Sequence, residues 1–221
     1  MTQQDRTPTA VIARQVRQLR DSYNWSAERL ANEMTQAGAP WDRTIVANLE
    51  NGRRSTVSVA ELLALAYVLD VPPISLLAPL DKDETVTVLP GLDLRPYELR
   101  AWLIGTSRLA SRVTPDTPTR MQRWQQAVQP IRLYERLTDV NRELHRLDVD
   151  RRAAEKIGET TRVQKAEAAY MDGLKTWAEV IQAMRENGMQ PPALIPRWVN
   201  DARELGLLDE HTNTGADNGQ R

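Results

Sequence analysis

The sequence offers few side chains suited to catalysis. Its 221 residues include two histidines and no cysteine, which excludes disulfides, thiol nucleophiles and cysteine-based zinc sites. His145 and His211 have neither a neighbouring nucleophile nor metal-ligand spacing, and the common phosphate-binding, zinc-peptidase and serine-hydrolase motifs are absent. The carboxylates alternate with arginines, as on a solvated helical surface. We therefore expect no enzymatic activity, no metal and no cofactor.

The chain shows no targeting or membrane signal. Its beginning, MTQQDRTPTA, is polar and lacks the apolar segment of a signal peptide. No apolar run approaches the ~20 residues that span a bilayer. With 41% hydrophobic residues the chain can bury a core. We expect a cytoplasmic protein that does not associate with membranes.

Charge is distributed unevenly along the chain, although the net charge is only −1. Residues 1–60 hold eight arginines and six carboxylates, a surplus of +2, whereas residues 61–118 hold five basic and eight acidic residues. Residues 119–221 hold sixteen of each. Any electrostatic footprint for nucleic acid is therefore N-terminal, and it is modest.

Five short helices are predicted over residues 9–78. Apolar residues recur at helical spacing over residues 9–23, and the later segments repeat the pattern between turn signals. The start signals of the other four helices are Ser26, Asp42, the capping box of Ser58 with Glu61, and Pro73.

The remainder predicts a connector followed by longer helices. Residues 79–95, with a β-branched run at 85–88, predict an extended linker or a short strand, and 96–113 predict a helix. Residues 119–187 predict two or three helices, because Pro130 should kink or start a helix and Gly158 weakens the middle. A last helix is expected over 196–208. Residues 1–8 and 209–221 are expected to be flexible or disordered.

Two apolar patterns mark the C-terminal part, which we expect to be partly coiled-coil-like. A stripe of apolar residues from Met121 to Leu147 is interpreted as intramolecular core. A heptad pattern is formed by Tyr170, Leu174, Trp177, Ile181 and Met184. It fits either a dimer seam or an internal hairpin, and we favour dimerisation.

Three segments carry a family resemblance. VRQLRDSYNWSAERLANEM, RTIVANLENGRR and VSVAELLALAYVLDVPPISLL together resemble the Cro and phage-repressor (XRE-type) helix-turn-helix family, in particular its actinobacterial members. The match covers residues 9–78, and LENGRR before an amphipathic helix ending in LDVPP is its most specific part. The resemblance implies an all-α chain with a five-helix, lambda-repressor-like DNA-binding domain at 9–78 and a helical domain at 96–208.

The resemblance also implies which residues would read bases. In this family the third helix enters the major groove, and here its solvent-facing side chains are Arg43, Thr44 and Asn48. Their chemistry fits that role: arginine pairs bidentately with guanine, asparagine pairs with adenine, and threonine contacts the thymine methyl group. Asp42 caps this helix and is also placed near the bases.

Further arginines take roles implied by the resemblance. Arg53 and Arg54 follow the third helix and are expected to bind phosphates. Arg14 or Arg17 of the first helix is expected to do the same. In this family an arginine of the first helix commonly pairs with the glutamate of the ENG-like turn, so Arg20 and Glu50 are expected to form a structural pair.

Two departures from the family pattern concern the second helix. Ala27 stands where the family usually has a DNA-supporting glutamine, so that contact is lost. The link TQAGAPWD is about five residues longer than the compact phage form, and Trp41 is expected to fill the hydrophobic position at the turn. The docking angle of the third helix depends on this link.

The sequence thus predicts a transcriptional regulator, a repressor, that binds a pseudo-palindromic DNA operator as a homodimer. The alternative is a protein-interaction module, such as an antitoxin or adaptor, whose helical C-terminal part binds a partner protein. A ligand-responsive regulator is also open, with a small-molecule effector held among aromatic residues of the C-terminal domain. The candidate lining residues are Trp102, Trp124, Tyr134, Tyr170 and Trp177.

Overall fold

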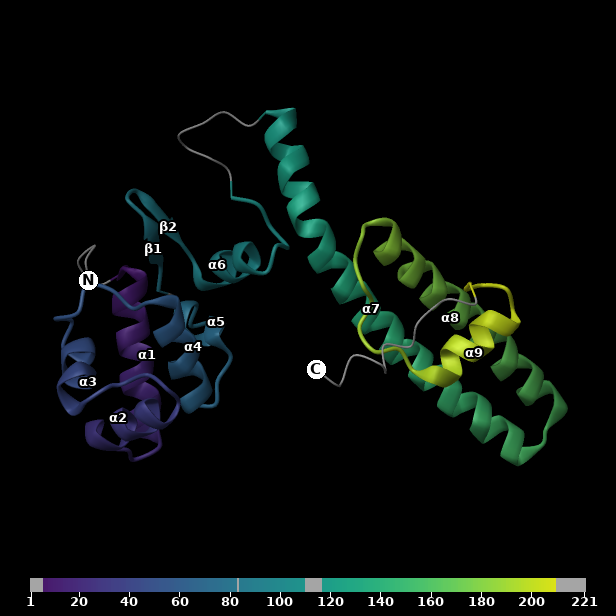
Figure 1. Cartoon of the computed structure of the whole chain (residues 1–221), viewed down its shortest axis with the longest axis horizontal. Helices are drawn as coiled ribbons and strands as arrows, with labels where there is room; N and C mark the ends of the chain where they lie inside the picture. Colours follow the sequence, from purple (N-terminus) through teal and green to yellow (C-terminus); the bar gives the residue numbers. More distant parts are fainter. Residues whose placement is uncertain (1–5, 83, 110–116, 210–221) are drawn as a thin grey trace. The chain divides into compact units, whose positions relative to one another are not determined.

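The computed structural model describes residues 6–82, 84–109 and 117–209 and divides the chain into two compact units, Met1–Leu109 and Ala110–Arg221. Both units are mainly helical, as predicted for an all-α chain (Figure 1). The elements of the first unit are α1 (Pro8–Ser22), α2 (Ala27–Gln36), α3 (Arg43–Glu50), α4 (Val59–Val68), α5 (Pro73–Leu77), β1 (Val86–Leu89), β2 (Leu92–Leu94) and α6 (Pro96–Leu103). Those of the second unit are α7 (Pro118–Ile157), α8 (Thr160–Glu186) and α9 (Pro196–Glu204).

Side-chain caps start the first four helices. Thr7, Ser26, Asp42 and Ser58 each accept a hydrogen bond from the backbone N–H three residues further on. Glu61 returns the bond by accepting from the Ser58 N–H at 2.9 Å, which completes the capping box. The caps predicted for α2, α3 and α4 are confirmed.

Helices α1 to α5 enclose one apolar core. Helices α1 to α3 turn their apolar side inward, as the helical periodicity predicts. The larger buried members are Ile12, Val16, Leu30, Met34, Trp41, Val46, Leu49, Leu65, Leu69 and Leu76.

Residues 79–95, predicted as an extended linker or short strand, contain a hairpin that belongs to the first unit. Strands β1 and β2 pair antiparallel, with Val86 opposite Leu94. Both side chains are buried in a second apolar cluster with Val11 of α1 and Leu99 of α6. Because this burial ties the hairpin and α6 to α1, the boundary between the units falls after residue 109 and not at 96.

The helix predicted over 96–113 ends at Leu103. The chain turns at Gly105, which has a φ of 78°, and the Thr106 N–H donates to the Ala101 carbonyl at 2.9 Å. Glycine adopts this left-handed conformation without steric cost, so the turn ends the helix there. Residues 110–113 lie outside the described residues.

The second unit is built on two long helices that run antiparallel, with α9 packed against α8 (Figure 1). α7 continues through Pro130, which was predicted to kink or start a helix. Pro130 is exposed. Because proline lacks one backbone N–H, the helix loses a single hydrogen bond at this position and continues. α7 ends at Gly158, a left-handed cap with a φ of 74°, so residues 119–187 form two helices.

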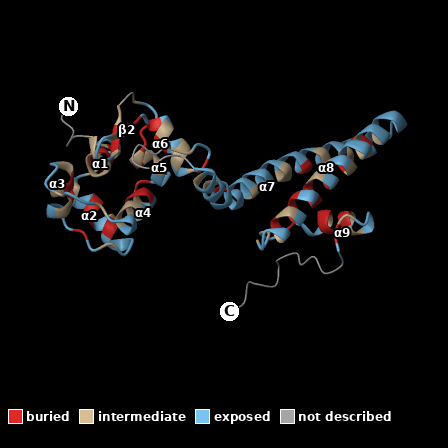
Figure 2. Ribbon diagram, turned by 90° about the horizontal axis from the view of Figure 1, so that it is seen from above, coloured by how far each residue is buried: buried red, intermediate tan, exposed pale blue. Residues whose placement is uncertain are grey.

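The heptad positions of α8 are buried within a single chain. Figure 2 shows buried residues gathered where α7, α8 and α9 face one another. The five heptad residues pack with Leu137, Leu144, Trp198, Val199 and Ala202. The favoured interpretation of this heptad as a dimer seam is therefore wrong, because the positions are filled by the hairpin partner and α9.

The α7 stripe is only partly core. Leu137 and Leu144 are buried, whereas Met121, Ile131 and Tyr134 are exposed. Residues 1–5 and 210–221, predicted to be flexible or disordered, lie outside the described residues. Within the described ranges, no helix has both the length and the apolar character needed to cross a membrane.

Candidate nucleic-acid interface

α3 is held along its inner face and at both ends. Val46 and Leu49 are fully buried in the core. At the start of the helix, Asp42 Oδ1 accepts a hydrogen bond from the Ile45 N–H at 2.7 Å. At its end, the Asn48 carbonyl accepts bonds from two backbone N–H groups of the following turn. The outer side chains of α3 therefore project from a fixed frame.

An ion pair joins α1 to the end of α3. Arg20 donates from Nε to Glu50 Oε1 at 2.6 Å and from Nη2 to Oε2 at 2.8 Å, and from Nη1 to the Trp25 carbonyl at 2.7 Å. Both side chains are largely buried, with 12% and 9% exposed. The hydrogen bond to Glu50 raises the pKa of Arg20 above its ordinary value, so the guanidinium remains charged. The predicted pairing of Arg20 with Glu50 is present.

Trp41 closes the long link between α2 and α3. Its side chain is 6% exposed and belongs to the core. The Thr35 hydroxyl donates to the Trp41 carbonyl at 2.9 Å, which ties the link to the end of α2. Trp41 thus fills the hydrophobic position at the turn, as predicted.

Arg54 is engaged with its own domain. It donates to Glu61 Oε1 at 2.8 Å, and its guanidinium lies 5.4 Å from the Trp41 ring centroid. The Trp41 indole N–H donates to the same carboxylate oxygen at 3.2 Å. Burial alone would raise the pKa of Glu61, but hydrogen bonds from Ser58 and Arg54 outweigh burial and lower it. Arg54 was predicted to bind phosphate, but these contacts give it a structural role within its own domain.

Four polar side chains in and after α3 are not engaged in this way. Arg43, Thr44 and Arg53 are exposed, and Asn48 is half-buried. Within the described ranges, none of these four side chains makes a hydrogen bond or a salt bridge. They cover the outer side of one short helix and the turn that follows it.

The two candidate arginines of α1 differ. Arg14 pairs with Glu84, just before β1, at 2.9 Å. Arg17 is 59% exposed, and its nearest carboxylate, Asp21, lies at 3.9 Å. Of the two, Arg17 is the one whose charge faces solvent.

The second unit has a charged centre that the sequence analysis missed. Asp148 of α7 is fully buried and lies 3.5 Å from Arg151 Nη2 and 3.0 Å from Arg152 Nη2. Arg197 of α9 contacts the same carboxylate. The spacing of Asp148 from Arg151 and Arg152 is that of a helical pair, but nothing local marks the aspartate as buried.

A tyrosine adds a second link to α9. The Tyr170 hydroxyl donates to Asp201 Oδ2 at 2.5 Å, and the Arg151 guanidinium lies 4.4 Å from the Tyr170 ring centroid. Burial, followed by the bond to Asp201, raises the pKa of Tyr170 well above its ordinary value. These contacts hold α9 against the hairpin of α7 and α8.

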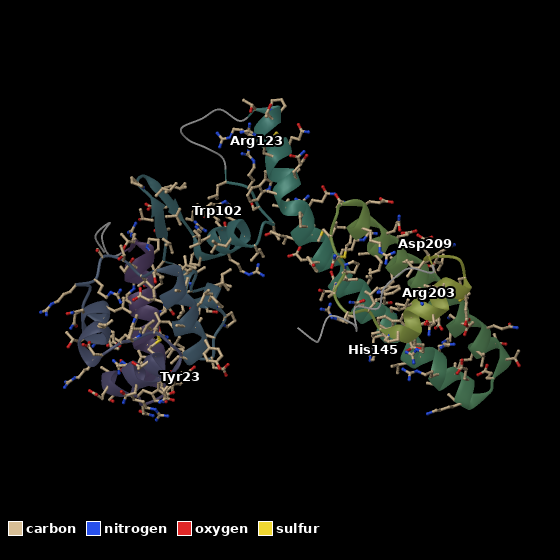
Figure 3. The ribbon with its side chains drawn as sticks, in the orientation of Figure 1. Tyr23, Trp102, Arg123, His145, Arg203 and Asp209 are labelled. Atoms are coloured by element: carbon tan, nitrogen blue, oxygen red, sulfur yellow. The ribbon has the colours of Figure 1, made fainter. Side chains whose placement is uncertain are left out.

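The aromatic residues considered for an effector pocket do not form one cluster. Trp102 lies on α6 in the first unit (Figure 3). Tyr170 and Trp177 are buried in the core of the second unit, where Trp177 stacks edge-on against Trp198 with centroids 6.0 Å apart. Trp177 also donates to Asn141 Oδ1 at 2.8 Å.

His145 lies exposed on α7 (Figure 3), and in the described part of the chain no group of three acidic or histidine side chains could hold a metal ion. His211 lies outside the described residues. The chain matches no protein-family model, no curated protein and no solved structure in the comparisons made.

Proposed function

We propose that this protein is a sequence-specific DNA-binding regulator, a transcriptional repressor, whose α3 enters the major groove. The observation that carries the proposal is that the arginines around α3 fall into two groups, those paired with carboxylates and those without a partner among the described residues. Arg14, Arg20 and Arg54 are bonded to carboxylates from other elements. Arg43 and Arg53, by contrast, stand on a braced helix and turn without a partner among the described residues.

The available groups suit the edges of bases. Arg43 and Thr44 lie in the exposed first turn of α3, and Asn48 lies one turn later. An arginine offers a bidentate contact to guanine, an asparagine one to adenine, and a threonine a contact to the thymine methyl group. We assign base reading to these three residues.

The phosphate contacts are assigned to Arg17 and Arg53, whose charges face solvent. Arg14 and Arg54 leave this set because Glu84 and Glu61 already engage them. With two such contacts in each copy, binding should weaken as salt rises, because each neutralised phosphate releases counterions.

A single unit of this kind makes few base contacts, so we expect two copies to bind a pseudo-palindrome with half-sites about one helical turn apart. The test is selection of bound duplexes from a random DNA pool by the purified full chain. Enrichment of an inverted repeat is expected. Equal affinity for every duplex would remove the sequence-specific claim and favour a protein-interaction role.

A further inference from the structure

α4 is apolar around its circumference, yet one face is open to solvent. Its sequence is VAELLALAYV, in which Glu61 is the only charged residue. A helix of this composition is normally buried on all sides. The side chains of Val59, Leu63 and Tyr67, which we call the α4 ridge, are 74%, 52% and 81% exposed.

Helical periodicity does not single out the α4 ridge, because α4 is apolar on nearly all sides. The core side of α4 is filled by Leu65 and Ala66, with Leu69 just beyond the helix. A spacing of four residues places the members of the ridge one above another, and their exposure shows that this row faces solvent. Isolated apolar residues are common on surfaces, whereas a contiguous row indicates a contact site.

A groove lies beside the α4 ridge, with a volume of about 640 Å³. One of its walls is α4 itself, through Ala60 and Ala64, and the other is the link between α2 and α3 together with Ile45 and Asn48 of α3. The link contributes the small residues Ala37, Gly38, Ala39 and Pro40. The same surface therefore carries a ridge of large side chains and a depression whose two walls include small ones.

We propose that a second copy of this chain binds at the α4 ridge and groove. A two-fold interface uses the same patch on both copies, so the patch must be complementary to itself. A ridge next to a groove meets this condition, because the ridge of each copy can enter the groove of the other.

The charges of this surface also fit a second copy. The ridge has no charged residue, and Glu61 beside it is paired with Arg54 at 2.8 Å. Two copies therefore bring no unpaired like charges together. A ten-residue helix is only about 15 Å long, so the contact is smaller than a standard stable interface and the dimer is a weak one.

This pairing would set the distance between two recognition helices. α3 and α4 share one core, so a contact through α4 fixes how two copies of α3 are spaced, with Asn48 of each copy beside the contact. That use rests on the proposed DNA-binding function, whereas the pairing itself does not.

The first test is disulfide trapping of the full chain, which has no native cysteine. Single variants Val59→Cys, Leu63→Cys and Tyr67→Cys are oxidised mildly without DNA and followed on non-reducing gels. The matched control is Leu103→Cys on α6, where the leucine is 44% exposed. At least one ridge variant should form covalent dimer roughly ten times faster than the control, since it lies near the two-fold axis. Rates equal to the control for all three overturn the proposal.

The second test is sedimentation velocity of Leu63→Glu, with Leu103→Glu as its control. Leu63→Glu should raise the dimer dissociation constant roughly tenfold or more, because it places two carboxylates in the contact. A dimer that persists unchanged in Leu63→Glu overturns the proposal. Neither test contains DNA, so failure here leaves the proposed DNA-binding function to be judged by the duplex selection.

Discussion

The two units use arginine in different ways. Along α7, Arg142, Arg146, Arg151 and Arg152 each pair with a carboxylate three or four residues away. Around α3, some arginines reach carboxylates on distant elements, while Arg43 and Arg53 pair with none among the described residues. Local pairing is what a solvated helix does, so it indicates little about function. An unpaired arginine on a braced helix stands out against that background and is available to a partner.

The units also place their strongest ionic contacts differently. In the first unit the Arg20–Glu50 pair braces the end of the exposed helix. In the second, Asp148 lies at the centre and joins α7 to α9. The first arrangement supports a surface, whereas the second closes a core.

The largest expected effect tests the buried centre of the second unit. Asp148→Ala removes the buried carboxylate that the three arginines share and should destabilise this unit by about 3–5 kcal/mol. Hydrogen exchange of the full chain should show lost protection in α7, α8 and α9 and unchanged protection in α1 to α5. Asp150→Ala is the control, because Asp150 is exposed and, among the described residues, pairs with Arg146 alone. Equal loss of protection in both variants would show that burial of Asp148 does not matter.

The next effect tests the brace of the first unit. Glu50→Ala leaves the largely buried Arg20 without its bidentate partner and should cost about 2–4 kcal/mol. The loss should appear as faster exchange in α1 and α3, with the second unit unaffected. Glu33→Ala, whose 4.0 Å contact with Arg29 is exposed, should change little. A Glu50 variant as stable as the Glu33 variant contradicts this account.

A smaller effect concerns the pH dependence of stability in the second unit, through Tyr170. The folded-state pKa of Tyr170 is raised, so its contribution is complete below the unfolded pKa of about 10 and is lost as pH rises above it. Urea midpoints of the wild type should therefore fall on the alkaline side. The Tyr170→Phe side chain cannot ionise, so the urea midpoint of this variant should fall less steeply at alkaline pH. Its midpoint at neutral pH should be lower than that of the wild type, because the hydrogen bond to Asp201 is lost. Parallel pH profiles would contradict the assigned cause.

The opposite sign applies to Glu61 in the first unit. Its folded-state pKa is lowered, so its contribution is present above the ordinary glutamate pKa and is lost as pH falls through the folded value. Glu61→Gln should flatten the acid side of the stability profile of α1 to α5. The control is Glu28→Gln, since Glu28 is exposed. The stability profile of this variant against pH should follow that of the wild type.

The smallest effect concerns a single phosphate contact. Arg53→Ala should leave stability within about 0.5 kcal/mol, because the side chain is exposed and unpaired in the described residues. It should reduce the slope of log affinity against log salt by about one for each arginine lost. An unchanged slope would remove Arg53 from the phosphate set.

What could be predicted from the sequence was mostly local. The caps at Ser26, Asp42 and Ser58 depend on residues three positions apart, and the core faces of α1 to α3 depend on helical periodicity. The Arg20–Glu50 pair came from the family resemblance. Each of these is present in the structure.

What the sequence did not reveal depends on distant partners. Arg14 meets Glu84, which lies 70 residues further on. The heptad of α8 has the same spacing whether its partner is α7 or another chain, so spacing alone could not decide. Leu63 belongs to a helix that is apolar all round, where periodicity does not distinguish the inner face from the outer one.

The most direct test of the central claim is duplex selection repeated with Arg43→Ala and, as its matched control, Arg100→Ala. Arg100 is an exposed arginine on α6, away from α3 in the sequence. The account predicts that Arg43→Ala relaxes one position in each half-site, at a cost of about 1–3 kcal/mol for the preferred base, while Arg100→Ala selects the wild-type repeat. Identical repeats from all three proteins would contradict the placement of Arg43 against a base.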